Sequence, residues 1–339
     1  MTFDPVAFAR LLIDLPSPTE SELLVGELLE GELTRLGYTM RRQEVTPTRF
    51  NLLALAGGTP RVLFNSHIDT VPPWFASSED DQYLYGRGAC DTKGIIAAMI
   101  AAGERLRARG ISDFGFLFVV GEETDSIGAK AANTEFAGLG SEYVVVGEPT
   151  ESKFARASKG ALTCHVRFKG VAAHSAYPHL GESAINRMVA AIAEINQADW
   201  GSHEVLGKTT VNVGVVRGGE RPNIIPAEAE CEMIFRLVTT PEEVEHNLSI
   251  LVANHDGRIT LSRGNPPQFM VFPEGAESHV VAFNTDVPWL ANLGKPLLFG
   301  PGSILDAHGA NERISKRDLV AAVSTYEEMV VALLEGKVV

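Results

Sequence analysis

Cysteine is scarce in this sequence, with Cys90, Cys164 and Cys231 as the only examples among 339 residues. Their number is odd, and their spacing contains neither a CxxC pair nor the pattern of a metal finger. A disulfide framework is therefore not expected, and a reducing cytoplasm suits this composition best. None of the three lies in a nucleophile motif, and no GxSxG sequence is present, so covalent catalysis is the weaker alternative.

An excess of basic residues and a long apolar run are also missing. Lys and Arg number 29 against 43 Asp and Glu, which gives a formal charge of −14 at pH 7. Nucleic acids and anionic membrane surfaces attract basic patches, so neither is expected as a partner. The N-terminal stretch has no basic region that would mark a secretory signal, and no apolar run is long enough to span a bilayer. We expect a cytoplasmic protein.

What the sequence does contain is ordinary globular composition with alternating strand and helix patterns. Hydrophobic residues make up 45% and charged residues 21%, and the length favours two domains. Helices are expected at 4–14, after a capping box at Thr19–Glu22, and at 93–109. Apolar, β-rich runs at 50–56 and 61–67 predict strands, and continuous apolar runs at 114–121 and 142–148 predict strands buried on both faces. This alternation predicts an α/β sheet, in which ligands bind at the carboxyl ends of the strands.

The pattern changes near residue 160. Strands and helices then follow in the order β-α-β-β-α-β, which is the split βαβ unit of ferredoxin-like domains. The α/β pattern resumes with a helix near 279–292, a short strand at PLLFG and a final helix from about 316 to 335. We therefore predict a discontinuous catalytic domain at 1–157 and 265–339, with a second domain at 158–264 inserted into it.

Histidines and carboxylates lie at the predicted strand ends and in glycine-rich loops. The members of this set are His67 and Asp69, Asp91 in GRGACDTKG, Glu122 and Glu123, Glu148, and His308. Each has an ordinary alternative taken alone: Asp91 could cap a helix, for example, and His67 could be a histidine at a strand end. The GRG segment is not a phosphate loop, because Lys93 is followed by glycine rather than Ser or Thr.

Taken together, these residues indicate a metal site. Two adjacent carboxylates at the end of a buried strand repel each other unless a cation or a proton lies between them. Mixed His and carboxylate ligands suit zinc, cobalt or manganese, and an aspartate can bridge two ions. A metal-dependent hydrolase is therefore the favoured interpretation.

These motifs resemble the dinuclear zinc amidohydrolases and exopeptidases typified by acetylornithine deacetylase, succinyl-diaminopimelate desuccinylase and glutamate carboxypeptidase. The resemblance covers nearly the whole chain and keeps the order SHIDTVP, YGRGACDTKG, GEETDS, GEPT, AHSAYP, RPNIIPAEAE and GPG…AHGANE. It implies a zinc-exopeptidase-like catalytic domain with a mixed sheet between helices, and an inserted ferredoxin-like lid that also forms the dimer interface. The segment between Pro73 and Tyr85 is short for the family, so we expect a reshaped approach to the site.

The resemblance also implies residue roles. One divalent ion would bind His67, Asp91 and Glu148, and the other would bind Asp91, Glu123 and His308, with zinc favoured over cobalt or manganese. Glu122 would be the general base and Asp69 would orient His67. In the lid, His174 would stabilise the oxyanion, in the family's dimers at the partner subunit's site, while Arg236 and Asn223 would hold the substrate carboxylate and carbonyl region.

These roles lead to a functional expectation. The leading hypothesis is a homodimeric hydrolase that removes the acyl group of an N-acyl-L-amino acid, as acetylornithine deacetylase does in arginine biosynthesis. The alternatives are a desuccinylase, a deacetylase of acetylcitrulline or acetyllysine, and a dipeptidase or carboxypeptidase. A binding protein without activity is disfavoured, because such a protein has no need of Glu122.

Overall fold

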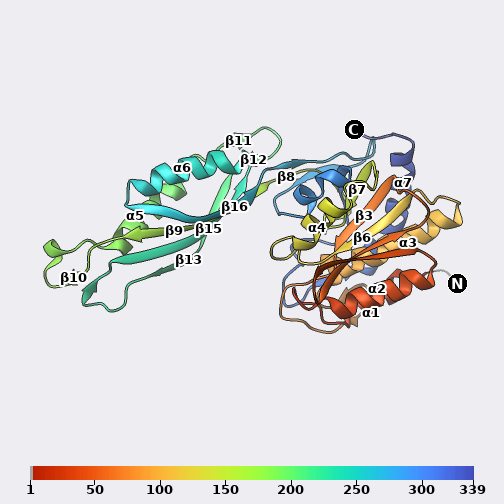
Figure 1. Cartoon of the computed structure of the whole chain (residues 1–339), viewed down its shortest axis with the longest axis horizontal. Helices are drawn as coiled ribbons and strands as arrows, with labels where there is room; N and C mark the ends of the chain where they lie inside the picture. The colour runs from red at the N-terminus through yellow and green to blue at the C-terminus, as the bar shows by residue number, and fades with distance from the viewer. Residues whose placement is uncertain (1–2) are drawn as a thin grey trace. The chain divides into compact units, whose positions relative to one another are not determined.

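The computed structural model describes residues 3–339, which form two compact units (Figure 1). The first unit comprises the chain up to Arg156 together with Phe269–His279 and Thr285–Val339, and the second comprises Ala157–Gln268 and Val280–Asn284. Within the described residues, no helix has the length and apolar character needed to cross a membrane.

A six-stranded mixed sheet forms the centre of the first unit, in the order β1-β2-β6-β3-β7-β19. Its strands are β1 (Thr39–Thr46), β2 (Arg49–Leu55), β3 (Val62–His67), β6 (Phe114–Val119), β7 (Tyr143–Val146) and β19 (Lys295–Leu298). The last four in this sheet order, β6, β3, β7 and β19, are parallel to one another, whereas β1 and β2 pair in antiparallel fashion. Every residue of β3, β6 and β7 is buried, as expected for parallel strands covered on both faces.

Helices cover both faces of this sheet. Helices α1 (Pro5–Ile13), α2 (Leu23–Arg35), α3 (Gly94–Ala108) and α7 (Lys316–Leu334) share one hydrophobic core with Phe64, Phe116 and Tyr326. On the other side, α4 (Ile127–Glu135) contacts β1, β2 and β6, together with the short helices η3 (Val287–Trp289) and η4 (Ala291–Leu293). The predicted mixed sheet between helices is therefore confirmed.

Smaller elements complete the first unit. The turn η1 (Ala89–Lys93) precedes α3, and β20 (Arg313–Ser315), β5 (Tyr83–Tyr85) and β4 (Ser78–Glu79) form a three-stranded sheet. Another three-stranded sheet, whose strands each have residues in both units, consists of β17 (Gln268–Phe269), β8 (Phe154–Ser158) and β18 (Ser278–Val281).

The second unit is a ferredoxin-like domain, as predicted. Its elements follow in the order β9 (Gly160–Lys169), α5 (Ala184–Gln197), β13 (Thr210–Gly218), β15 (Glu228–Leu237), α6 (Pro241–Ala253) and β16 (Gly257–Asn265). The strands pair in the antiparallel order β13-β15-β9-β16. Alternate residues such as Cys164, Met233 and Phe235 are buried with the helices in one core. A short ribbon of β10 (Ala173–His174) and β14 (Ile224–Ile225) belongs to the same unit.

Two local predictions are wrong. The capping box does not form, because the side chain of Glu22, the N-cap of α2, makes no capping hydrogen bond and the Thr19 hydroxyl donates to Asp69 instead. The helix predicted near 279–292 is replaced by β18, η3 and η4. The run HVVAF favours an extended strand through its β-branched and aromatic residues, and Pro288 lacks the backbone N–H that a continuous helix would require. All three cysteines are free and buried.

Candidate metal centre

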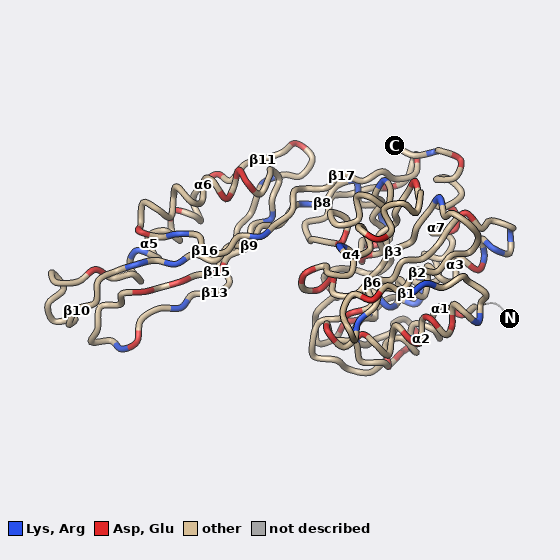
Figure 2. Tube along the Cα trace, in the orientation of Figure 1, with Lys and Arg blue, Asp and Glu red and all other residues tan. Residues whose placement is uncertain are grey.

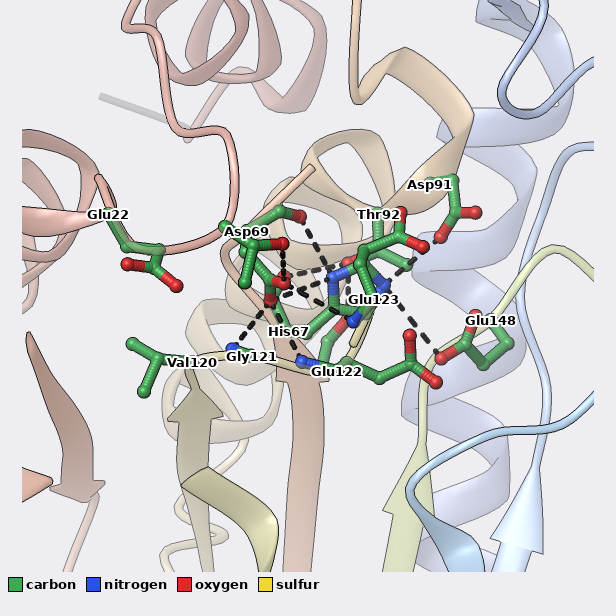
Figure 3. Close-up of polar contacts among 12 residues, drawn as sticks. Glu22, His67, Asp69, Asp91, Thr92, Val120, Gly121, Glu122, Glu123 and Glu148 are labelled. Carbon is green, nitrogen blue, oxygen red and sulfur yellow. Dashed lines mark hydrogen bonds and ion pairs between the residues drawn. The ribbon is translucent and has the colours of Figure 1, made fainter. Parts of the chain in front are cut away.

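Polar side chains lie at the ends of three neighbouring parallel strands, at the same edge of the sheet. His67 ends β3, Glu122 and Glu123 follow β6, and Glu148 follows β7. Asp91 comes from η1 before α3, and His308 comes from the loop between β19 and β20. Because the carboxyl ends of parallel strands meet at one edge, residues distant in sequence converge there (Figure 3).

The two ring nitrogens of His67 have different surroundings. Its Nδ1 lies 2.9 Å from the main-chain oxygen of Asp69, which fixes the ring orientation. Its Nε2 lies 3.1 Å from Oδ1 of Asp91 and 3.9 Å from Oε1 of Glu148. The nitrogen that faces the carboxylates is therefore the one available as a ligand, and the other is held by the backbone.

Asp91 lies between the two candidate histidine ligands. Its Oδ1 faces Nε2 of His67 at 3.1 Å, and its Oδ2 faces Nε2 of His308 at 3.3 Å. The same nitrogen of His308 lies 3.0 Å from Oε1 of Glu123. One carboxylate thus presents a separate oxygen to each histidine, which is the arrangement a bridging ligand requires.

Asp69 organises the turn that carries the paired glutamates. Its Oδ1 accepts backbone N–H groups from Gly121 at 2.9 Å and Glu122 at 3.1 Å, and its Oδ2 accepts that of Glu123 at 3.2 Å. The Thr19 hydroxyl donates to Oδ2 at 2.8 Å, whereas Nδ1 of His67 lies 3.5 Å from Oδ1. Asp69 therefore fixes both the orientation of His67 and the backbone of the turn (Figure 3).

Burial and mutual repulsion raise the pKa of two carboxylates. Burial, with the charge of Glu148, raises the pKa of Glu122 well above its usual value, and burial, with the charge of Asp91, does the same for Glu148. Burial opposes ionisation of Asp91 as well, but hydrogen bonds to His308 and His67 outweigh it and lower the pKa of that carboxyl.

Hydrogen bonds to carboxylates raise the pKa of both histidines. For His67, burial opposes the shift, but the hydrogen bonds to Asp69 and Asp91 leave its pKa well above the usual value. Hydrogen bonds to Asp91 and Glu123 raise the pKa of His308 to about 10. Without a metal the cluster therefore retains protons, which a divalent cation would displace.

This donor set fits divalent metal ions. Ligand atoms of His67, Asp91 and Glu123 lie within 4.8 Å of one another, as do those of His67, Glu122 and Glu148. Imidazole and carboxylate ligands of this kind suit zinc and its first-row neighbours. The first of these groups contains predicted ligands only, whereas the second includes Glu122, the predicted general base.

The three predicted lid residues belong to the second unit. His174 is exposed on β10, where its Nδ1 accepts the backbone N–H of Ala176 at 3.1 Å. The main-chain oxygen of Asn223 accepts the N–H of Ser175 at 3.1 Å, so Asn223 lies beside His174 in the ribbon. Arg236 lies on β15, is half-buried, and forms no side-chain hydrogen bond or ion pair with any residue the structure describes. Burial lowers its pKa, and its guanidinium remains available for an anionic ligand.

Comparisons with known proteins identify the family. Residues 156–259 match the family described as the peptidase dimerisation domain. The chain is 34% identical to a peptidase M20 domain-containing protein of Schizosaccharomyces pombe, across 96% of this chain and 84% of that protein. It is 36% identical to a probable carboxypeptidase of Aspergillus flavus, across 97% of this chain and 90% of that protein. The chain belongs to the M20 peptidase family.

Two solved structures show the same fold as this M20 peptidase. A tripeptidase of Staphylococcus aureus superimposes with a TM-score of 0.81 at 21% identity, covering 98% of this chain and 99% of that one. A dinuclear metal-binding M20 peptidase of Bacillus subtilis superimposes with a TM-score of 0.71 at 16% identity, covering 98% of each chain. The prediction of a hydrolase that acts on amide bonds is confirmed at the level of this family.

Two buried charged residues of this M20 peptidase adjoin the cluster and are not among the residues predicted from the sequence. Arg87 and Glu312 are 2% and 0% exposed, and Glu312 accepts the backbone N–H of Asp91. Both lie within motifs that carry the family resemblance, YGRGACDTKG and AHGANE. A charged residue among small residues in each motif is a signal that could have singled them out.

Proposed function

We propose that this protein hydrolyses the amide bond of an N-acyl-L-amino acid with the help of two divalent metal ions, zinc being favoured. His67, Asp91 and Glu148 would hold one ion, and Asp91, Glu123 and His308 the other. The observation that carries this proposal is the position of Asp91, with one carboxylate oxygen toward each histidine. Such ions, when bound, polarise the amide carbonyl and lower the pKa of a water molecule.

Glu122 is the group we assign to proton transfer. Its carboxylate would accept the proton of the attacking water and pass it to the leaving amine nitrogen. Burial and the charge of Glu148 raise the pKa of Glu122, and a raised pKa is the direction that suits a carboxyl group which takes up a proton and passes it on. Asp69 would keep Glu122 in position through the backbone N–H that it accepts.

The second unit would bind the part of the substrate that does not react. Arg236, half-buried and without a recorded partner among the described residues, suits a bidentate contact to the α-carboxylate. Asn223 would contact the carbonyl region, and His174 would stabilise the oxyanion. Because the matched family is a dimerisation domain, we further propose a homodimer in which His174 serves the partner's site.

A peptidase that removes a C-terminal residue is the second candidate, favoured by the carboxypeptidase name of the Aspergillus flavus relative. Both substrate classes contain an amide nitrogen next to a carbon that bears a carboxylate. The proposed roles of Glu122 and Arg236 therefore suit either class, and the group on the acyl side distinguishes them.

A hydrolysis panel tests the proposal. Purified protein loaded with zinc or cobalt is incubated with N-acetyl-ornithine, N-acetyl-citrulline, N-acetyl-lysine, succinyl-diaminopimelate and dipeptides, and the released amine is measured. We expect turnover of the acetylated amino acids, and none by the Glu122→Gln variant. Turnover of dipeptides alone would favour the second candidate, and no turnover of any amide by metal-loaded protein would contradict both.

A further inference from the structure

A buried ion pair lies directly behind the candidate metal ligands. Nη1 of Arg87 and Oε2 of Glu312 are 2.7 Å apart, and their side chains are 2% and 1% exposed. A buried ion pair contributes little net stability on average, because both charges lose their hydration. We therefore infer the role of this ion pair from its contacts with neighbouring groups.

Glu312 binds the backbone of the segment that carries Asp91. Its Oε1 accepts the backbone N–H groups of Cys90 at 3.3 Å and Asp91 at 3.2 Å. Glu312 itself is held in place, because its carbonyl oxygen accepts the N–H of Gly86 at 3.0 Å beside the β20–β5 pairing. The small sheet thus brings a carboxylate from the C-terminal part of the chain to the backbone of the candidate bridging ligand.

Arg87 connects the same pair to the segment that carries His308. Its Nη2 lies 3.5 Å from the carbonyl oxygen of His308, and its Nε donates to the carbonyl of Pro73 at 3.1 Å. His308 has a φ of 60°, a left-handed backbone conformation that is uncommon for residues other than glycine. Such a conformation persists only where the surrounding structure holds it.

The chemistry of this position requires a carboxylate. One oxygen of Glu312 accepts from backbone N–H groups and the other from a guanidinium, so both must be acceptors. A glutamine has only one acceptor oxygen, and its amide nitrogen would face donors on one side or the other. Burial and the charge of Asp91 raise the pKa of Glu312 to about 7 against the effect of Arg87, and a cation on Asp91 would reduce that repulsion.

We propose that Arg87 and Glu312 are positioning residues that set the distance between the Asp91 and His308 segments, and thereby the affinity for the ion that these two ligands share. This inference rests on the proposed metal centre. Neither residue would contact substrate or metal. They would act through the backbone of the ligands, and removing such outer contacts typically weakens metal binding by about 10- to 100-fold.

The test is metal binding measured by calorimetry and by the visible spectrum of bound cobalt, neither of which depends on turnover. Glu312→Gln is compared with Glu22→Gln as a matched control. Glu22 forms a similarly buried pair with Arg49, at 2.6 Å, but none of its recorded side-chain hydrogen bonds reaches a candidate ligand segment. Arg87→Lys is the second variant. Lysine keeps a positive charge beside Glu312 but lacks the additional guanidinium N–H groups that face the carbonyl oxygens of Pro73 and His308.

We expect wild-type protein and Glu22→Gln to bind two ions alike, and Glu312→Gln to bind the second ion about 10- to 100-fold more weakly with an altered cobalt spectrum. If Glu312→Gln does not fold, a weakened second ion in folded Arg87→Lys supports the inference equally. Wild-type affinity for both ions in whichever of these two variants folds would overturn it while leaving the metal centre intact. Wild-type protein that binds no divalent ion would overturn the metal centre, and this inference with it.

Discussion

The adjacent residues Glu122 and Glu123 differ in their surroundings although they follow the same strand. Glu123 lies 3.0 Å from Nε2 of His308 and is thereby engaged with a candidate ligand. Glu122 has no recorded side-chain hydrogen bond among the described residues, and burial together with the charge of Glu148 raises its pKa. This difference supports assigning proton transfer to Glu122 and metal binding to its neighbour.

Substituting each of these two glutamates separately tests this division of roles. We expect Glu122→Gln to reduce turnover by at least about 100-fold, because it removes the proton acceptor, while the metal content stays near that of wild type. We expect Glu123→Gln to lose metal. Plasma emission spectrometry of both variants, alongside kinetics, separates the effects, and loss of metal in Glu122→Gln would show that Glu122 is a ligand.

Asp69 provides a second test at the residue scale. In Asp69→Asn an amide nitrogen would face the backbone N–H groups of the 121–123 turn or the Thr19 hydroxyl, so at least one buried donor would lose its acceptor. We expect a loss of about 1–3 kcal/mol in the free energy of unfolding and weaker metal binding. Urea unfolding measures the first quantity. Thr19→Val removes a single hydrogen bond and should cost less, whereas equal losses would argue against a central role for Asp69.

Among the elements, the ends of three parallel strands explain why the sequence indicated that His67, the paired glutamates and Glu148 lie close together. Continuous apolar runs identify β6 and β7 as buried strands, and the shorter apolar run of β3 ends at His67, so the polar residues at these strand ends are expected at one edge of the sheet. Thr19 was assigned to a helix cap because local sequence matched a capping box, but Asp69, 50 residues away, takes its hydroxyl. The pairing of Arg87 with Glu312 could not be predicted, because it depends on the β20–β5 register, which no local pattern encodes.

The convergence of these elements predicts an unusual pH dependence of stability. His67, His308, Glu122 and Glu148 all have raised pKa values, so the metal-free folded state retains protons that the unfolded chain releases. For His308 the stabilisation is complete below pH 6.5 and is lost as the pH rises toward about 10. We expect the Tm of chelator-treated protein to fall across this range and that of zinc-loaded protein to fall much less. Scanning calorimetry measures the Tm of both forms at each pH. An equal change of Tm with pH in the two forms would contradict this expectation.

At the scale of the whole molecule, the acidic composition has two parts. Asp69, Asp91, Glu122, Glu123 and Glu148 gather at one edge of the sheet, whereas other Asp and Glu residues are distributed along helices, strands and loops of both units (Figure 2). The sequence predicted the first group and the ferredoxin-like insertion, because both depend on local patterns. Whether His174 serves its own subunit or the partner depends on assembly, which no pattern within one chain specifies.

Mixed dimers test the assembly. Glu122→Gln and His174→Ala subunits are co-expressed with different affinity tags, and the mixed dimer is isolated. If His174 serves the partner subunit, one of its two sites combines a wild-type Glu122 with a wild-type His174, and activity should return. A mixed dimer of Glu122→Gln and Glu123→Gln should stay inactive, since both residues belong to the same unit. An active monomer, or no recovery in the first mixture, would contradict a site shared between subunits.

We propose above all that one edge of the sheet holds two divalent ions joined by Asp91. The most direct measurement is anomalous diffraction at the zinc absorption edge from crystals of zinc-loaded protein. We expect two anomalous peaks about 3.5–4 Å apart, with Asp91 between them, His67 and Glu148 at one peak, and Glu123 and His308 at the other. A single peak, or peaks that are not joined by Asp91, would contradict it.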